Sequence, residues 1–168
     1  MNMEDSVMSM RIGFGTDRHR LVPGDGLWIG GVKVPCDIAS VAASDGDALL
    51  HALADALLGA GGLGDIGDHY PESRTTPGAA SAGFIAEILA LLADKRLSIV
   101  NVDLVVDLER PKLGDWKNAI RDNIASLLKL DASRVNVKAK SGEGVGPIGR
   151  GEAIGAQAIA LLETGALP

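Results

Sequence analysis

Apolar side chains recur at helical spacing in three stretches of the chain. Residues 45–58 carry a stripe with intervals of three and four, the repeat of a helix that buries one face: Leu49, Leu50, Leu53, Ala56 and Leu57. Ser44 followed by Asp47 resembles a capping box with Asp in place of Glu, and Gly59 ends the segment. Residues 80–95 and 115–128 show similar patterns, so we predict three helices.

The N-terminal part of the chain is typical of short β-strands. Residues 11–16 form a strand that ends at Asp17. Residues 27–29 and 32–34 flank Gly30-Gly31, a dipeptide typical of a tight hairpin turn. We therefore expect a strand and a hairpin before the first helix.

Two further strands are predicted in the second half of the chain. Residues 99–108 alternate Val or Leu with Asn or Asp, and residues 135–139 form another alternating run. Residues 153–162 are small and apolar, which fits a buried strand and a buried helix equally. The order of elements predicts an α+β (α/β two-layer) fold, with helices packed on one face of a mixed β-sheet.

The composition is that of an ordinary globular domain. The chain has 168 residues, of which 46% are hydrophobic and 23% charged, so it is long enough to bury a core. Aromatic residues are only 3%, so Ala, Val, Leu and Ile must build that core. The net charge of -6 argues against general nucleic-acid binding, which requires a basic face, but does not exclude a small anionic ligand.

The N-terminus and the single cysteine bear on location. Residues 1–10 lack the basic start and the apolar core of a signal peptide, so we expect a disordered or appended overhang before one domain of residues 11–168. A lone Cys36 cannot form an internal disulfide, and no apolar run is long enough to span a membrane. We expect a cytoplasmic protein without membrane contact.

Three side chains suggest a metal site. Asp17 and His19 are two residues apart, so in an extended segment they point to the same side. His51 lies on the first predicted helix, away from its apolar stripe and between Asp47 and Asp55, which could orient it. One carboxylate and two imidazoles suit zinc and leave a fourth position open. Taken singly, Asp-x-His is more often a surface turn and a helical His more often structural.

Two glycine-rich segments are candidate ligand loops. Residues 64–67 are either a flexible turn or a place where backbone amides approach a ligand closely. Residues 138–152 combine Lys, Ser, Arg and glycines, the groups that bind phosphate, although an ordinary glycine loop also fits. Glu143 in this cationic setting indicates a hard cation such as Mg²⁺ that is shared with phosphate oxygens.

Several motifs in one order resemble a known family. Between about residue 11 and residue 162 the chain is similar to 2-C-methyl-D-erythritol 2,4-cyclodiphosphate synthases, and the similarity rests on these segments: Asp17-Arg18-His19-Arg20-Leu21, Gly30-Gly31-Val32, Ser44-Asp45-Gly46-Asp47, Leu50-His51-Ala52-Leu53, Gly64-Asp65-Ile66-Gly67, Arg110-Pro111-Lys112 and Gly149-Arg150-Gly151-Glu152.

The resemblance implies an enzyme of the non-mevalonate isoprenoid pathway. Members of the family cyclise 4-diphosphocytidyl-2-C-methyl-D-erythritol 2-phosphate to the 2,4-cyclodiphosphate and release CMP, as phosphorus–oxygen lyases. The resemblance implies a ferredoxin-like subunit in a homotrimer with active sites between subunits, and makes residues 153–162 a strand. It also implies Zn²⁺ on Asp17, His19 and His51, and Mg²⁺ or Mn²⁺ on Glu143.

The resemblance also assigns the substrate contacts. Ser44, Lys140 and Ser141 are expected to act in catalysis. Residues expected to bind the cytidine diphosphate substrate come from the zinc site, the methylerythritol pocket, the cytosine loop and the phosphate loop: Asp17, His19, Ala43, Ser44, Asp65, Ile66, Gly67, Tyr70, Pro71, Glu72, Ser73, Arg74, Leu108, Glu109, Arg110, Pro111, Lys112, Leu113, Gly114, Lys140, Ser141, Gly142, Glu143, Pro147 and Arg150.

Arg150 has two interpretations. In relatives an Arg at this place faces a central cavity that can hold an isoprenoid diphosphate, and Pro147 with Ile148 would make its wall apolar. Alternatively, Arg150 stabilises the trimer through Glu152 or a neighbouring chain.

The chain departs from the family pattern at three places. Ala43 replaces a His that contacts the diphosphate, Lys140-Ser141 replaces two threonines, and residues 70–74 replace Phe-Pro-Asp-Thr-Asp. The missing His leaves open a zinc- and nucleotide-binding relative without turnover. A metal-dependent phosphoesterase that uses water as nucleophile is the other alternative.

Overall fold

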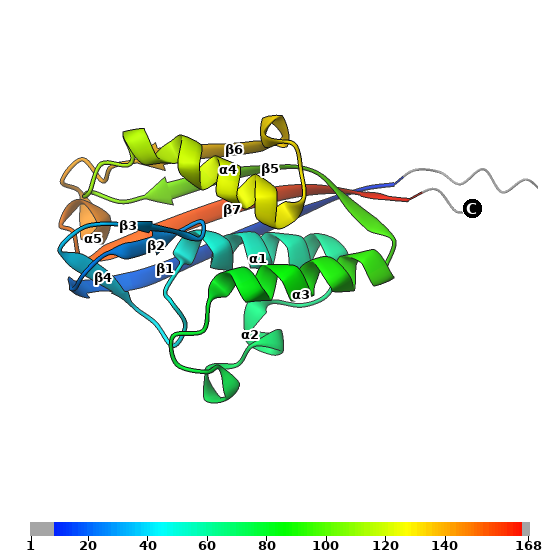
Figure 1. Ribbon diagram of the computed structural model, residues 1–168, viewed down its shortest axis with the longest axis horizontal. Coiled ribbons are helices and arrows are strands. Elements are labelled where there is room, and N and C mark those ends of the chain that lie inside the picture. The colour runs from blue at the N-terminus through cyan, green and yellow to red at the C-terminus, as the bar shows by residue number, and fades with distance from the viewer. Residues whose placement is uncertain (1–8, 166–168) are drawn as a thin grey trace, which may run out of the picture.

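A five-stranded mixed sheet forms one layer of the molecule (Figure 1). The computed structural model describes residues 9–165. The strand order is β4-β1-β7-β5-β6, and the β5–β6 pair is parallel while the other three pairs are antiparallel. A separate hairpin of β2 and β3 lies beside the sheet. The strand bounds are β1 Met10–Pro23, β2 Leu27–Ile29, β3 Val32–Val34, β4 Ile38–Val41, β5 Leu97–Asp107, β6 Val135–Lys140 and β7 Ala153–Thr164.

Three long helices cover one face of this sheet (Figure 1). They are α1 (Ala48–Gly61), α3 (Ser81–Asp94) and α4 (Lys117–Leu128). Helix α1 packs on β1 and β7, and α4 packs on β6. Short helical turns complete the connections: α2 Ile66–His69, α5 Gly146–Gly149 and the 3₁₀ turns Glu72–Arg74, Gly114–Trp116 and Ala132–Arg134. The predicted α+β architecture with helices on one face is confirmed.

Helix α1 sits unusually close to β1. A Cβ atom added to Gly13 would lie 1.8 Å from the carbonyl oxygen of Ala56, and one added to Gly15 would lie 2.0 Å from that of Ala52. Only glycine leaves room for a helix backbone at this distance. The two glycines therefore fix the height of α1 above the sheet.

The core between the sheet and the helices is aliphatic, as the low aromatic content predicts. Its largest fully buried side chains are all Leu or Ile: Leu27, Ile29, Leu49, Leu50, Leu53, Leu57, Leu58, Ile85, Ile88, Leu92, Leu104 and Ile120. The opposite face of the sheet exposes Ile12, Phe14 and Ile159, which are 72%, 61% and 43% accessible. This uncovered apolar face is a notable feature of the single chain.

Several predicted boundaries were wrong. Strand β1 does not end at Asp17 but runs to Pro23, because it pairs with β7 as far as Arg20 and with β4 beyond it. It also begins at Met10, one residue before the predicted start of the strand, where Met10 pairs with Glu163. Residues 1–8 of the predicted overhang lie outside the described residues.

Helix α1 also starts later than its capping pattern predicted. It begins at Ala48, and its N-cap is Asp47, whose carboxylate accepts from the Leu50 amide at 3.0 Å.

Strand β4 and helix α2 were not predicted, because segments of four residues carry too little periodicity. The ambiguous segment 153–162 is a strand, within β7. Among the described residues, every helix is too short or too polar to cross a lipid bilayer.

Candidate active site

The three predicted metal ligands lie together at the junction of β1 and α1. Asp17 Oδ2 is 2.9 Å from His19 Nε2 and 2.9 Å from His51 Nδ1, and the two imidazole nitrogens are 3.2 Å apart. Within residues 9–165 they form the one group of three or more His, Cys, Asp or Glu side chains close enough to share an ion. A carboxylate and two imidazoles at this separation fit a zinc-type donor set.

The strand pleat and the glycine contacts place these ligands. Asp17 and His19 continue the face of β1 that begins with Gly13 and Gly15, so they point toward α1. His51 is the neighbour in sequence of Ala52, whose carbonyl lies over Gly15. Because α1 packs so closely on β1, His51 contacts Asp17, although the two residues are 34 positions apart in the sequence.

The electrostatics of the cluster favour the ionised carboxylate. Burial by itself would raise the pKa of the Asp17 carboxyl. Hydrogen bonds and charge interactions with His19 and His51 outweigh burial and hold the pKa of Asp17 far below its ordinary value. Asp17 is therefore an anion ready to bind a cation.

The far side of the His51 ring contacts two hydroxyls and no carboxylate. His51 Nε2 lies 2.9 Å from Ser81 Oγ and 3.1 Å from Ser44 Oγ. The prediction that Asp47 and Asp55 orient His51 was wrong. Asp47 is fully buried and accepts from the amides of Gly30, Gly31 and Leu50 at 2.9, 2.6 and 3.0 Å, and Asp55 accepts from the amide of Ile66 at 2.8 Å.

A cavity of about 260 Å³ opens onto the three ligands. Twelve residues line it: Asp17, His19, Val41, Ala42, Ala43, Ser44, His51, Ile66, Gly67, Tyr70, Thr75 and Phe84. The Tyr70 ring stacks on Phe84 with ring centroids 4.2 Å apart, and the Tyr70 hydroxyl donates to Glu87 at 2.9 Å. The predicted contacts Ala43, Ser44, Ile66, Gly67 and Tyr70 are thus brought together with the metal ligands.

Four other residues of the predicted methylerythritol pocket do not line this cavity: Asp65, Pro71, Ser73 and Arg74. The side chain of Glu72 lies outside the described part of the structure. Asp65 caps α2 by accepting from the Asp68 amide at 3.0 Å. Pro71, Ser73 and Arg74 lie at or in the turn Glu72–Arg74, beyond Tyr70. Phe84 and Thr75 were missed by the sequence reasoning. Phe84 carried a readable signal, as a lone aromatic residue near the start of a predicted helix in a chain with 3% aromatics.

A second cluster of predicted residues gathers where β5 and β6 end. Glu109 Oε2 accepts from the Gly142 amide at 2.9 Å, which ties the segment 108–114 to the segment 140–143. Ser141 Oγ donates to Glu143 Oε1 at 2.6 Å, and Lys112 Nζ lies 3.8 Å from Glu109. No residue of either segment lines the cavity beside the metal ligands. Within one chain, the structure does not bring Glu143 and the metal cluster into one site.

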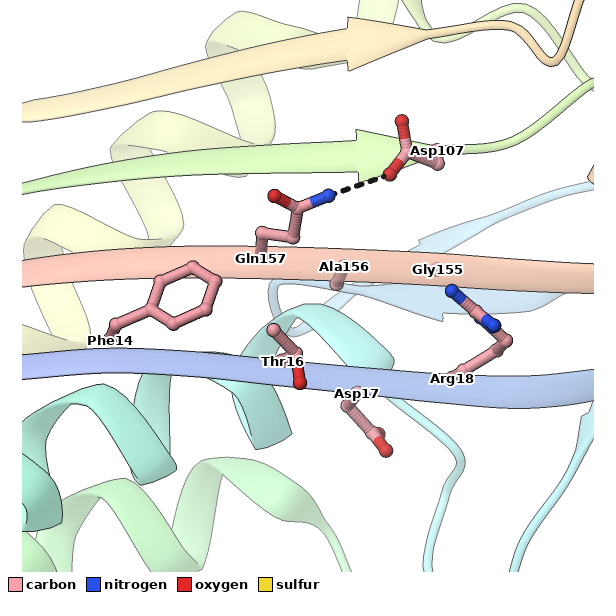
Figure 2. Close-up of a pocket in the computed structure, with 8 residues that line it drawn as sticks. All are labelled: Phe14, Thr16, Asp17, Arg18, Asp107, Gly155, Ala156 and Gln157. Atoms are coloured by element: carbon pink, nitrogen blue, oxygen red, sulfur yellow. Dashed lines mark hydrogen bonds between the residues drawn. The ribbon is translucent and has the colours of Figure 1, made fainter.

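A larger and shallower depression lies on the uncovered face of the sheet. It measures about 550 Å³ and is drawn in Figure 2. Phe14, Thr16 and Arg18 from β1 line it opposite Asp107 and Gln157, and the Gln157 amide donates to Asp107 at 3.3 Å. Arg150 does not line it; its guanidinium donates to both carboxylate oxygens of Glu152 at 2.8 and 2.9 Å.

Comparison with known proteins identifies the family. The YgbB family model matches residues 10–163. The chain belongs to the YgbB family. The 2-C-methyl-D-erythritol 2,4-cyclodiphosphate synthase of Paraburkholderia phymatum is 49% identical over 156 residues, which cover 92% of this chain and 98% of the relative. The synthase of the same description from Solibacter usitatus is 46% identical over 155 residues, with coverage of 92% and 98%.

The solved structures agree with this assignment. A structure of 2C-methyl-D-erythritol-2,4-cyclodiphosphate synthase in a CDP-bound form matches with a TM-score of 0.83 at 38% identity. The match covers 90% of this chain and 99% of that one. The family resemblance predicted from the motifs is confirmed, and the family match spans residues 10–163.

Ala43 and Lys140 are two positions at which this YgbB family member departs from the family pattern, and they lie in different parts of the structure. Ala43 lies in the cavity wall beside Ser44, so a longer side chain there would have open space beside the metal ligands. Lys140 ends β6 and is exposed, in the second cluster. Within one chain Lys140 lies in the segment 140–143 and does not line the cavity beside the metal ligands.

Proposed function

We propose that this protein is a phosphorus–oxygen lyase that cyclises 4-diphosphocytidyl-2-C-methyl-D-erythritol 2-phosphate and releases CMP. The observation that carries the proposal is the convergence of Asp17, His19 and His51 on one cavity, in a chain that matches the YgbB family over residues 10–163. The relatives named above carry this activity in their descriptions.

Asp17, His19 and His51 would hold Zn²⁺. Their donor atoms all lie within 4.8 Å of one another, and two nitrogens with one carboxylate oxygen suit zinc better than magnesium. When bound, the ion would act as a Lewis acid that polarises the β-phosphate of the substrate. The proton-free Asp17 carboxylate prepares the site for the cation.

Glu143 would hold a second, hard cation, Mg²⁺ or Mn²⁺, near the α- and β-phosphates. Glu143 has a left-handed backbone with φ of 50° and accepts from the Ser141 hydroxyl, which fixes its carboxylate at the surface of the phosphate loop. Carboxylate oxygens are the ligands that Mg²⁺ prefers. The segment 108–114, tied to Gly142 through Glu109, would receive cytosine.

The two halves of the proposed site would meet in a homotrimer. Glu143 and the metal ligands face different surroundings within one chain, so a neighbouring copy must supply one half. The uncovered sheet face with Ile12, Phe14 and Ile159 offers an apolar surface for association. Size determination by light scattering tests this directly, and a monomeric active protein would refute the shared site.

The reaction needs positioning more than a protein nucleophile. An oxygen of the 2-phosphate attacks the β-phosphorus in line, the bond to the α-phosphate breaks, and CMP leaves as a monoester. Ser44 at the cavity wall and Ser141 at the phosphate loop would hold phosphate oxygens in that geometry. The Tyr70–Phe84 stack would cover the methylerythritol group and keep water from competing with the 2-phosphate.

Lys140 would compensate for the missing His at position 43. It contributes a cation to the segment 140–143, and negative charge develops on the α-phosphate of the leaving CMP in the transition state. A Lys140→Ala variant should therefore lose on the order of 10²-fold in kcat. Full activity of this variant would show that Lys140 does not compensate.

Two further proposals concern surroundings of the site. Arg150 and the apolar Pro147 would line a central cavity of the trimer that accepts an isoprenoid diphosphate, although its pairing with Glu152 also fits a purely structural role. We place the protein in the cytoplasm, where a lone thiol such as Cys36 stays reduced.

One assay tests the proposed reaction. The protein is incubated with the cytidyl diphosphate substrate, Zn²⁺ and Mg²⁺, and phosphorus NMR follows the products. Cyclic diphosphate with CMP is the expected result. Absence of CMP would indicate a binding protein without turnover, and a linear monoester would indicate a phosphoesterase.

A further inference from the structure

The ring nitrogen of His51 that faces away from the metal site lies in a chain of polar contacts. His51 Nε2 is 2.9 Å from Ser81 Oγ, and the Ser81 hydroxyl also reaches Asp45 Oδ1 at 2.5 Å. Ser81 is 1% exposed, so water does not compete for these contacts. Asp45 and Ser81 are 36 residues apart in sequence; Asp45 lies in the loop before α1, and Ser81 is the first residue of α3.

The backbone fixes which way these hydrogen bonds point. The amide of Ser81 donates to Asp45 Oδ2 at 3.0 Å, and the carboxylate can only accept. The Ser81 hydroxyl proton is therefore committed to Asp45 Oδ1. Its oxygen keeps its lone pairs for His51 Nε2, so that nitrogen carries a proton and donates it to Ser81. The other neighbour of Nε2, Ser44 Oγ at 3.1 Å, can also accept from it, as it does from the Gly46 amide at 3.2 Å.

We infer that Asp45 and Ser81 are positioning residues that set the tautomer of His51 for metal binding. In a neutral ring that binds the ion, a proton on Nε2 leaves the lone pair on Nδ1, the nitrogen that faces Asp17 and His19. Partners of this kind raise the basicity of a ligating imidazole and hold its ring in place. The inference rests on the metal site of the proposed function and names residues that act behind it.

The same contacts link the metal site to helix α3. Ala80, the N-cap of α3, has no side-chain acceptor. The Asp45 carboxylate caps the helix instead, because it accepts from the amide of Ser81, the first helical residue. Asp45 N also donates to Ala79 O at 3.0 Å, so the two segments lie side by side. Phe84, one turn further along α3, lines the cavity. One carboxylate thus positions both a metal ligand and a cavity wall.

Two variants separate this role from simple helix capping. Ser81→Ala removes the hydroxyl that links His51 Nε2 to Asp45, leaves the Ser44 hydroxyl as the other contact of that nitrogen, and keeps the backbone amide that Asp45 caps. Asp45→Asn keeps the shape of the side chain but reverses the direction of its hydrogen bond with the Ser81 hydroxyl. The Ser81 amide lies 3.0 Å from one carboxylate oxygen, and the Asp47 amide lies 3.3 Å from the other. The shorter contact favours the Asn carbonyl oxygen at the Ser81 amide, so that its NH₂ group faces the Ser81 hydroxyl and donates to it. The serine proton then turns toward His51 Nε2 and opposes the tautomer that binds metal.

Zinc affinity measured by competition with a chromophoric chelator is the main test. Zn²⁺ should bind Ser81→Ala about 10–100-fold more weakly than the unaltered protein, and Asp45→Asn at least as weakly. Ser126→Ala, on the exposed face of α4, is the matched control and should leave zinc affinity unchanged. In the zinc-loaded protein, the His51 Nε2 proton should give a resolved NMR signal that moves upfield in Ser81→Ala.

The outcomes distinguish this inference from the proposed function. Equal zinc affinity in Ser81→Ala and the unaltered protein overturns the inference, even if the variant melts at a lower temperature without metal, because that pattern is purely structural. Failure of the unaltered protein to bind zinc overturns the inference together with the metal site. Zinc affinities that follow the expected order in a protein that releases no CMP support the inference while the proposed reaction fails.

Discussion

Gly15 sets the distance between β1 and α1, and a single methyl group there should disrupt both stability and metal binding. The Cβ of Gly15→Ala would lie 2.0 Å from Ala52 O, about 1.4 Å short of the 3.4 Å at which ordinary contact begins, and 2.6 Å from Ala56 N. Both atoms belong to the helix backbone, so no side-chain rotation relieves the clash. Helix α1 must move away from the sheet.

This movement would act directly on the metal ligands. His51 precedes Ala52 on α1, and Asp17 follows Gly15 on the same face of β1, so the 2.9 Å contact between His51 Nδ1 and Asp17 Oδ2 would open. Overpacking of this kind costs roughly 1–3 kcal/mol in free energy of unfolding. We expect that loss, together with a clear drop in zinc affinity.

Urea denaturation and chelator competition measure the two effects. Gly59→Ala is the matched control on the same helix, because a Cβ there meets nothing within 4 Å. Relief of helical glycine entropy should stabilise that variant by about 0.5–1 kcal/mol without changing zinc affinity. If Gly15→Ala unfolds at the same urea concentration and binds zinc as the unaltered protein does, the packing argument is wrong.

Three other predictions follow from named contacts. Ala43→His should raise kcat by up to about 10²-fold in the phosphorus assay, because it adds a donor in the cavity wall; unchanged kcat would show that the native site is not impaired there. Tyr70→Phe removes the hydroxyl that donates to Glu87 and should raise KM while kcat changes little, as steady-state kinetics can check. Burial raises the pKa of Asp103, but its hydrogen bond and ion pair with Lys138 prevail and lower it. The ionised carboxylate therefore stabilises the fold above about pH 4, and this small contribution is lost as pH falls below it. In Asp103→Asn, the melting temperature should depend less on pH between about pH 5 and pH 2 than in the unaltered protein. An identical dependence in both proteins would contradict this ion-pair role.

Local pattern was sufficient for most of the fold. Periodicity reports which side of an element is buried, so the long helices, the hairpin and strands β5 and β6 could be predicted close to their observed bounds. It could not show that β1 continues beyond Asp17, because pairing with β4 and β7 decides where a strand ends. The small residues of β7 likewise fit a helix as well as a strand, and pairing with β1 and β5 makes the segment a strand.

The sequence by itself determined the chemistry of the metal ligands. The Asp17-x-His19 spacing places two donors on one side of any extended strand, and the order of motifs identifies the family. Only the tertiary structure decided their surroundings. Asp47 accepts hydrogen bonds from the amides of the β2–β3 turn and does not contact His51. The His51 ring instead contacts Ser81, on a helix distant in sequence. Spacing along a chain fixes the direction of near neighbours, whereas the partner of a buried polar group depends on which elements pack together.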